Sequence, residues 1–208
     1  MTSGTATRRL AERPQTLGEI RLAQEAVAKR RRRISLAAWG VALLIIVTLV
    51  AAALLSSRPV VSSEARVAPD FTLPTSDGQT VTLSSLQGSP VILYFNEGAG
   101  CDSCLMQMAE IEKNPGFAEA GITVLPIVMN TAEQINAERA RLGVTADFLL
   151  DDGTVSEQYG TLGTGMHEGL PGHGFILIDA EGVQQWYGNY PSMWLAPQDL
   201  LKEVQSRL

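Results

Sequence analysis

The longest apolar run in the chain is residues 34–55, which comprises 22 residues without a charge. Its only hydroxyl residues are Ser35 and Thr48. Because an α-helix rises 1.5 Å per residue, the run would span roughly 30 Å, the thickness of a bilayer's hydrocarbon core. The pattern predicts a single transmembrane helix. A cleaved signal peptide is the alternative, although its apolar core is usually about 7–15 residues long and follows a short basic stretch.

From Pro69 onward the pattern changes to short strands that alternate with amphipathic helices. The continuous apolar run 91–95 is typical of a central strand that is covered on both faces. Strand, helix, strand and helix, followed by a hairpin and a last helix, indicate an α/β layered domain over residues 69–208. The predicted strands are 71–73, 80–83, 91–95, 122–129, 148–150, 175–178 and 183–187, and the predicted helices are 101–113, 131–142 and 195–208.

Charge divides the chain into a basic head and an acidic body. Residues 1–33 carry nine Lys or Arg and three Glu, whereas the rest of the chain carries seven basic and nineteen acidic residues. The basic cluster Lys29–Arg33 precedes the apolar run, so we expect 1–33 to be a cytoplasmic tail and the C-terminal domain to lie outside the cytoplasm. We interpret the polar segment 56–68 as a linker. The acidic body argues against a nucleic-acid partner.

The candidate chemistry lies in the only two cysteines, Cys101 and Cys104. They follow a Gly-Ala-Gly turn after strand 91–95 and open the next predicted helix. Unpaired amides and the helix dipole stabilise a thiolate at the first cysteine, so we expect Cys101 to attack and Cys104 to resolve. Asp102 adds a negative charge beside that thiolate, which by itself opposes the fall in pKa and favours a reducing pair.

Several segments resemble the redoxin branch of thioredoxin-fold proteins, which includes the peroxiredoxins (the alkyl hydroperoxide reductase/thiol-specific antioxidant family) and membrane-anchored thiol–disulfide reductases. The resemblance covers residues 69–208 and rests on the cysteine motif, on Ala68-Pro69-Asp70-Phe71-Thr72-Leu73-Pro74 and on Phe175-Ile176-Leu177-Ile178-Asp179-Ala180-Glu181-Gly182. It implies a thioredoxin-like fold, with a central mixed sheet flanked by helices, and a redox-active disulfide that needs neither a cofactor nor a metal.

The resemblance also marks a substrate-binding loop. Reductases of this branch place a cis-proline three residues before the hairpin Phe, whereas Pro171 stands four residues before Phe175. We expect the Leu170–Pro171 bond to be cis and the loop to dock an extended substrate by main-chain hydrogen bonds. His173, in the same Gly-rich loop, is either solvated or placed beside the cysteines, and the sequence leaves both open. The branch also usually has Trp before the first cysteine, where this chain has Gly100.

Two other functions remain open. In peroxiredoxins the peroxide-reactive cysteine stands nine residues after the strand Phe, which is Cys104 counted from Phe95. The arginine of that family, three residues before the hairpin Phe, is replaced by Gly172. A copper-delivery protein would use Cys101, Cys104 and His173, since thiolates with imidazole suit copper. His167 is more typical of a surface loop.

These observations together predict a membrane-anchored thiol–disulfide oxidoreductase outside the cytoplasm. The pair Cys101–Cys104 would cycle between dithiol and disulfide and reduce protein disulfides, with peroxide as the alternative substrate. Leu170, Pro171 and His173 are the predicted substrate-binding residues.

Overall fold

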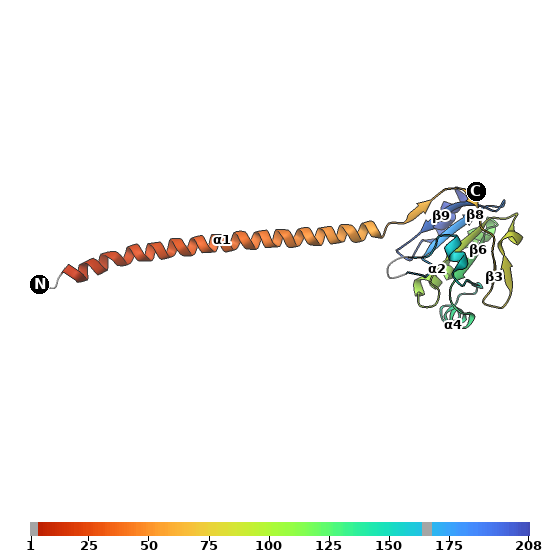
Figure 1. Cartoon of the computed structure of the whole chain (residues 1–208), viewed down its shortest axis with the longest axis horizontal. Coiled ribbons are helices and arrows are strands. Elements are labelled where there is room, and N and C mark those ends of the chain that lie inside the picture. The colour runs from red at the N-terminus through yellow and green to blue at the C-terminus, as the bar shows by residue number, and fades with distance from the viewer. Residues whose placement is uncertain (1–3, 164–167) are drawn as a thin grey trace. The chain divides into compact units, whose positions relative to one another are not determined.

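The computed structural model describes residues 4–163 and 168–208. They divide into two compact units, one reaching to Leu55 and one formed by Ser56–Leu208. The first unit is a single helix, α1, over Gly4–Ser56, which continues from the basic segment through the apolar run (Figure 1). Its part Arg21–Ser56 contains a stretch that is long and apolar enough to cross a membrane. A signal sequence near an N-terminus satisfies the same criteria.

The second unit is built on a mixed sheet with the strand order β1-β9-β8-β5-β6-β7, in which β2 also pairs with β9. Strand β5 lies at the centre, parallel to β6 and antiparallel to β8. All five residues of β5 are buried, as its unbroken apolar sequence predicts. The strands are β1 (Val60–Ser62), β2 (Arg66–Val67), β5 (Val91–Phe95), β6 (Thr123–Val128), β7 (Leu149–Leu150), β8 (Gly174–Ile178) and β9 (Val183–Asn189).

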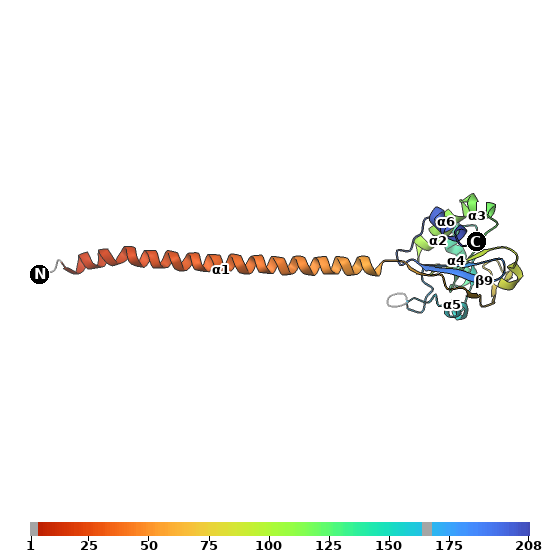
Figure 2. The same cartoon turned by 90° about the horizontal axis from the view of Figure 1, so that it is seen from above.

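Helices and a hairpin cover the two faces of this sheet. Alternate side chains of β5 enter two cores, with Ile92 and Tyr94 in one and Leu93 and Phe95 in the other. The first core is closed by α2 (Asp102–Glu112), α3 (Pro115–Glu119), α4 (Ala132–Leu142) and α6 (Pro197–Gln205). The second is closed by β3 (Thr72–Pro74), β4 (Thr80–Thr82), the 3₁₀ helix η1 (Leu83–Leu86) and α5 (Thr154–Gln158). Figure 2 shows α2, α3 and α6 on one side of the sheet and α5 on the other.

Local signals explain where the helices begin and end. Helix α4 starts with a capping box between Thr131 and Gln134 and ends at Gly143, which adopts a left-handed conformation. Asn114-Pro115 ends α2, as predicted, and the same residues start α3, because the Asn114 side chain accepts a hydrogen bond from the Gly116 amide. The short helices α3 and α5 were not predicted, since five residues are too few to show a helical period.

Segment 56–68, which we predicted to be a linker, contributes two short strands to the sheet. Strands β1 and β2 both pair antiparallel with β9, placing Val60 opposite Asn189 and Arg66 opposite Gln184. The Arg66 side chain also donates a hydrogen bond to Gln184, at 3.0 Å. The physical reason is that these strands satisfy the edge of β9, which would otherwise present unpaired backbone groups. Only Ser57–Pro59 separate α1 from β1.

Candidate active site

A tight turn carries the chain from β5 to the first cysteine. The Asn96 side chain spans its base, accepting from the Gly98 amide at 3.0 Å and donating to the Tyr94 carbonyl at 3.1 Å. The Ala99 amide donates to the Asn130 side chain at 2.9 Å. Gly98 has φ = 64°, and a Cβ there would lie 2.0 Å from the Asn130 side-chain oxygen. Glycine is therefore required at position 98 to bring Asn130 against the turn.

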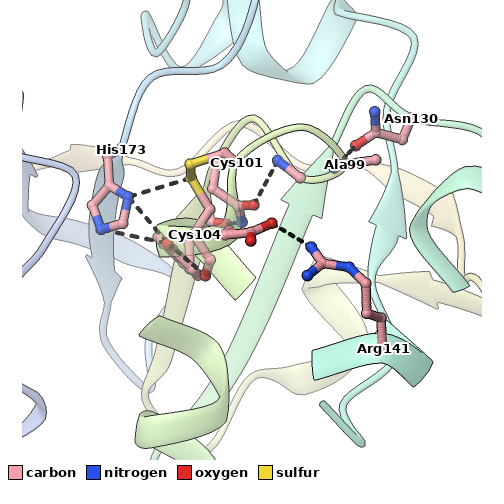
Figure 3. Close-up of a disulfide and its surroundings, with 10 residues drawn as sticks. Ala99, Cys101, Cys104, Asn130, Arg141 and His173 are labelled. Carbon is pink, nitrogen blue, oxygen red and sulfur yellow. Dashed lines mark hydrogen bonds and ion pairs between the residues drawn. A yellow bond between two sulfur atoms is a disulfide. The ribbon is translucent and has the colours of Figure 1, made fainter. Parts of the chain in front are cut away.

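The two cysteines form a disulfide across the first turn of α2 (Figure 3), with their Cα atoms 5.4 Å apart. Cys101 is the N-cap residue of α2 and is half-buried, whereas Cys104 is fully buried. In the reduced protein, a thiolate on Cys101 would lie beside the first amides and the positive end of the helix dipole, which lowers a thiol pKa. The geometry provides one accessible sulfur and one sheltered sulfur.

An ion pair joins the start of α2 to α4. The Asp102 carboxylate, next to Cys101, accepts from the Arg141 guanidinium, which also pairs with Glu138. Asp102 was expected to oppose a thiolate on Cys101. Because Arg141 balances its charge, that opposition is weaker than the sequence indicates, although both side chains are exposed and screened by solvent.

A buried histidine lies on the inner side of the disulfide. The His173 side chain is 1 % exposed, and its Nδ1 lies 3.7 Å from Cys104 Sγ and 3.1 Å from the Tyr94 hydroxyl. Burial lowers the pKa of His173 from 6.5 to about 4, so the imidazole is neutral near pH 7. Burial also raises the pKa of Tyr94, whose hydroxyl therefore stays protonated. Phe175, stacked on Tyr94 at 4.5 Å between ring centroids, closes this cluster.

Two of the three predicted substrate-binding residues have other contacts. The Leu170 carbonyl accepts from the Gly163 amide at 2.8 Å, and Pro171 forms an isolated bridge with Leu162. The expected cis bond before Pro171 is wrong, because no peptide bond between described residues is cis. An X–Pro bond stays trans unless its surroundings impose the cis form, and here a trans chain already pairs with residues 161–163. Leu170 is 42 % exposed, so its predicted contact with substrate stays a prediction.

The copper alternative requires three ligands around one ion. Within residues 4–163 and 168–208, no group of three or more His, Cys, Asp or Glu side chains is placed to hold a metal. In the disulfide the two sulfurs are bonded to each other, and His173 is the one imidazole beside them in the described part of the chain. His167 lies outside the described residues. The described geometry gives the copper alternative no support.

Comparison with known families settles the kind of protein. The sequence model of the AhpC/TSA family matches residues 65–186. This chain belongs to the AhpC/TSA family. Membership makes it a thiol-based redox protein, as the resemblance of its cysteine motif and last hairpin implied.

One curated relative and two solved structures are similar to this chain. Peroxiredoxin Bcp of Escherichia coli K12 is 35 % identical over 124 residues, which cover 56 % of this chain and 78 % of that protein. The crystal structure of peroxidoxin BcpB from Mycobacterium tuberculosis has a TM-score of 0.59 at 20 % identity, covering 69 % of this chain and 97 % of that one. The solution structure of a putative protein disulfide isomerase from Bacteroides thetaiotaomicron has a TM-score of 0.54 at 27 % identity, covering 69 % and 88 %. The predicted thioredoxin-like fold is confirmed.

Sequence reasoning missed three members of this AhpC/TSA site. Tyr94 sits in an apolar strand, and its hydroxyl, which needs a partner when buried, was the one available signal. Arg141 belongs to α4, and nothing local in the sequence links it to Asp102, 39 positions away. Asn130 follows β6 without any motif, and it reaches the site because β6 runs parallel to β5 and ends at the same edge.

Proposed function

We propose that this AhpC/TSA-family protein is a membrane-anchored thiol–disulfide oxidoreductase that reduces protein disulfides outside the cytoplasm. The observation that carries the proposal is the asymmetric pair at the start of α2, with Cys101 half-buried and Cys104 fully buried in one disulfide. An exposed thiolate is suited to attack a substrate, and a sheltered thiol one turn away is suited to finish the reaction.

The reaction transfers two electrons from the cysteine pair to the substrate. The Cys101 thiolate attacks one sulfur of the substrate disulfide, forms a mixed disulfide and releases the other sulfur as a thiolate. Cys104 then attacks the Cys101 sulfur, and the bond between Cys101 and the substrate breaks. The substrate leaves as a dithiol after taking up protons from water, and the Cys101–Cys104 disulfide is restored. A partner dithiol outside the cytoplasm must reduce the pair for the next cycle.

A thiol peroxidase is the second candidate, and the peroxiredoxin relatives favour it. In that reaction Cys104 would attack peroxide and become a sulfenic acid, and Cys101 would then condense with it to form the disulfide and release water. Two features oppose this function. Cys104 has no exposed surface, and Gly172 stands where peroxiredoxins carry the arginine that activates peroxide.

The choice between the two candidates predicts a difference in substrate preference. The reduced full chain in detergent should be oxidised faster by a protein disulfide than by hydrogen peroxide at equal concentration. Its rate with peroxide should stay within about tenfold of a free thiolate, since the activating arginine is missing. Stopped-flow fluorescence or acid-quenched mass spectrometry measures both rates. The Arg139→Lys variant, altered in α4 at a residue that pairs with Asp147, serves as a control for folding.

The opposite preference would decide for the peroxidase. Oxidation by peroxide at a rate far above that of a free thiolate, with slow exchange against a protein disulfide, would replace the proposed activity. Slow reaction with both oxidants would reject both candidates.

The proposed location predicts a defined topology. The Lys29–Arg33 cluster should hold the N-terminal end of α1 in the cytoplasm, so a reporter fused after Leu208 should be active only outside it. The control fusion, with the reporter before residue 1, should show the opposite behaviour. Intact mass of the isolated protein tests whether the apolar segment is retained. Cytoplasmic activity of the C-terminal fusion, or a mass that lacks residues 1–55, would reject a membrane-anchored domain of this orientation.

A further inference from the structure

Two buried polar side chains behind the disulfide have no part in the reaction as described so far. Tyr94 comes from β5 and His173 from the residue before β8, so they are 79 positions apart in the sequence. The Phe175 ring packs against both of them, and the Tyr190 ring packs against Phe175. The main chain fixes the histidine as well, because its carbonyl accepts from the Tyr190 amide at 2.8 Å. Figure 3 shows the imidazole directed at Cys104.

The Tyr94 hydroxyl has two nearest acceptors at equal distance, and His173 Nε2 lies farther away, at 3.4 Å. Its oxygen lies 3.1 Å from the Cys104 carbonyl oxygen and 3.1 Å from His173 Nδ1. A hydroxyl carries one proton and two lone pairs, and it rotates to suit its partners. When Nδ1 is unprotonated, Tyr94 can donate to it. When Nδ1 carries a proton, Tyr94 can accept from Nδ1 and donate to the Cys104 carbonyl instead.

Tyr94 therefore satisfies His173 in either protonation state without movement of a heavy atom. A buried polar group left without a partner destabilises the fold, and this arrangement avoids that cost on both sides of a proton transfer. Cys104 Sγ lies 3.7 Å from His173 Nδ1, the nitrogen that would gain the proton. A thiol at that position has a proton acceptor within reach.

We propose that His173, positioned by Tyr94, accepts the proton of Cys104 when Cys104 attacks the mixed disulfide. This inference rests on the proposed oxidoreductase function and assigns a catalytic residue and a positioning residue to its second step. The S–H bond of Cys104 breaks, and its proton moves to Nδ1 while its sulfur bonds to Cys101 Sγ. The bond from Cys101 to the substrate sulfur breaks, and the substrate leaves as a thiolate. His173 then gives its proton to water or to that thiolate.

The surroundings keep the imidazole unprotonated, which is the form that can accept a proton. Its pKa of about 4 in the disulfide state results from burial, so the ring is neutral at pH 5–8. The titratable groups around it are the Tyr94 hydroxyl from β5 and the Cys104 sulfur of α2, which contact the ring, and Tyr190 beyond β9, which packs against Phe175. Burial raises the pKa of both tyrosines, so neither ionises in this range. The charges of Asp102 and Arg141, at the solvent-exposed start of α2, are paired with each other. A nascent thiolate on Cys104 would stabilise the imidazolium in this apolar setting.

The test follows both steps in one trace, using the reduced full chain in detergent and a symmetric chromophoric aryl disulfide. Attack by Cys101 releases the first aryl thiolate, and attack by Cys104 on the mixed disulfide releases the second. The His173→Gln variant keeps a hydrogen-bonding side chain that cannot titrate. We expect it to slow the second release about 10²-fold, a typical contribution of a general base, and to leave the first release within about threefold.

The pH profile separates proton transfer from a structural role. With His173 present, the second step should be independent of pH between about 5 and 8, because the proton acceptor is neutral throughout. In His173→Gln only thiol that has already ionised can attack, so that rate should rise about tenfold per pH unit. Tyr94→Phe should slow the second step without creating this slope. Tyr159→Phe is the matched control, since it also loses a buried hydroxyl that donates to a carbonyl, that of Pro69, but in the other core.

The possible results distinguish failure of the inference on His173 from failure of the proposed oxidoreductase function. Equal slowing of both releases in His173→Gln, with a flat pH profile, would show a structural role and overturn the inference, as would an unchanged second release. If Gln at this position prevents folding, the inference depends on Tyr94→Phe, and a second step no slower than in Tyr159→Phe would overturn it. Absence of the two releases in the unaltered protein would instead reject the proposed oxidoreductase function.

Discussion

Changing Cys104 to Ser is expected to turn the protein into a covalent trap, whereas changing Cys101 to Ser is expected to abolish the reaction. Without Cys104, the mixed disulfide between Cys101 and the substrate cannot be resolved and accumulates. Without Cys101, the remaining sulfur is fully buried and cannot reach a protein disulfide. Exchange in Cys101→Ser should fall on the order of 10³-fold or more, because the attacking nucleophile is lost.

Intact mass spectrometry after mixing each variant with an oxidised protein substrate measures the outcome. The adduct should appear on Cys104→Ser and should disappear on reduction. Ser103→Ala, altered on the same turn of α2, is the matched control and should form no lasting adduct, because both cysteines remain. Adducts on Cys104 in Cys101→Ser, or sulfenic acid there after peroxide, together with an inert Cys104→Ser protein, would reverse the assigned roles and support the peroxidase.

An isolated domain that starts at residue 69 is expected to be much less stable than one that starts at residue 57. The shorter chain loses β1 and β2, whose five residues pair with β9. It also loses the Arg66–Gln184 hydrogen bond and the hydrogen bond from the Ala68 amide to the Gly182 carbonyl. At roughly 0.5–1.5 kcal/mol net for each hydrogen bond, the free energy of unfolding should fall by about 2–5 kcal/mol.

Urea unfolding of the two domains, followed by circular dichroism, measures this difference. The shorter domain should also self-associate, because β9 becomes an open edge strand, and size-exclusion chromatography detects that change. The domain that starts at residue 57 provides the reference in both measurements. Equal stability and a monomeric shorter domain would mean that residues 57–68 behave as the linker that their polar sequence suggested.

The sequence could predict the parts of the fold that have a strong local signal. Residues 91–95 are apolar throughout because β5 is buried on both faces, and Thr131 with Gln134 marks the start of α4. β1 and β2 have no such signal, since they are two or three residues long and exposed. Their pairing depends on the edge of β9, which lies more than a hundred positions away.

The same distinction applies to the candidate site. The spacing of Cys101 and Cys104 at a strand–helix junction was sufficient to predict their pairing, because both ends of the contact lie in one turn. The relation of His173 to Tyr94 was not predictable, because it arises only when β8 pairs with β5 and places Phe175 beside Tyr94. The trans Pro171 was missed for a similar reason, since the partners of its loop determine the bond.

Because the chain contains two cysteines and both belong to one pair, its redox state in living cells can be read without background. A thiol-alkylating reagent adds two labels to the dithiol form and none to the disulfide form. In the mixed disulfide with a protein partner, Cys101 is bonded to the partner and is not labelled, whereas Cys104 takes one label. This complex migrates at the summed mass of the two proteins. Gel mobility after rapid alkylation would therefore report how the pair is distributed among its working forms in growing cells.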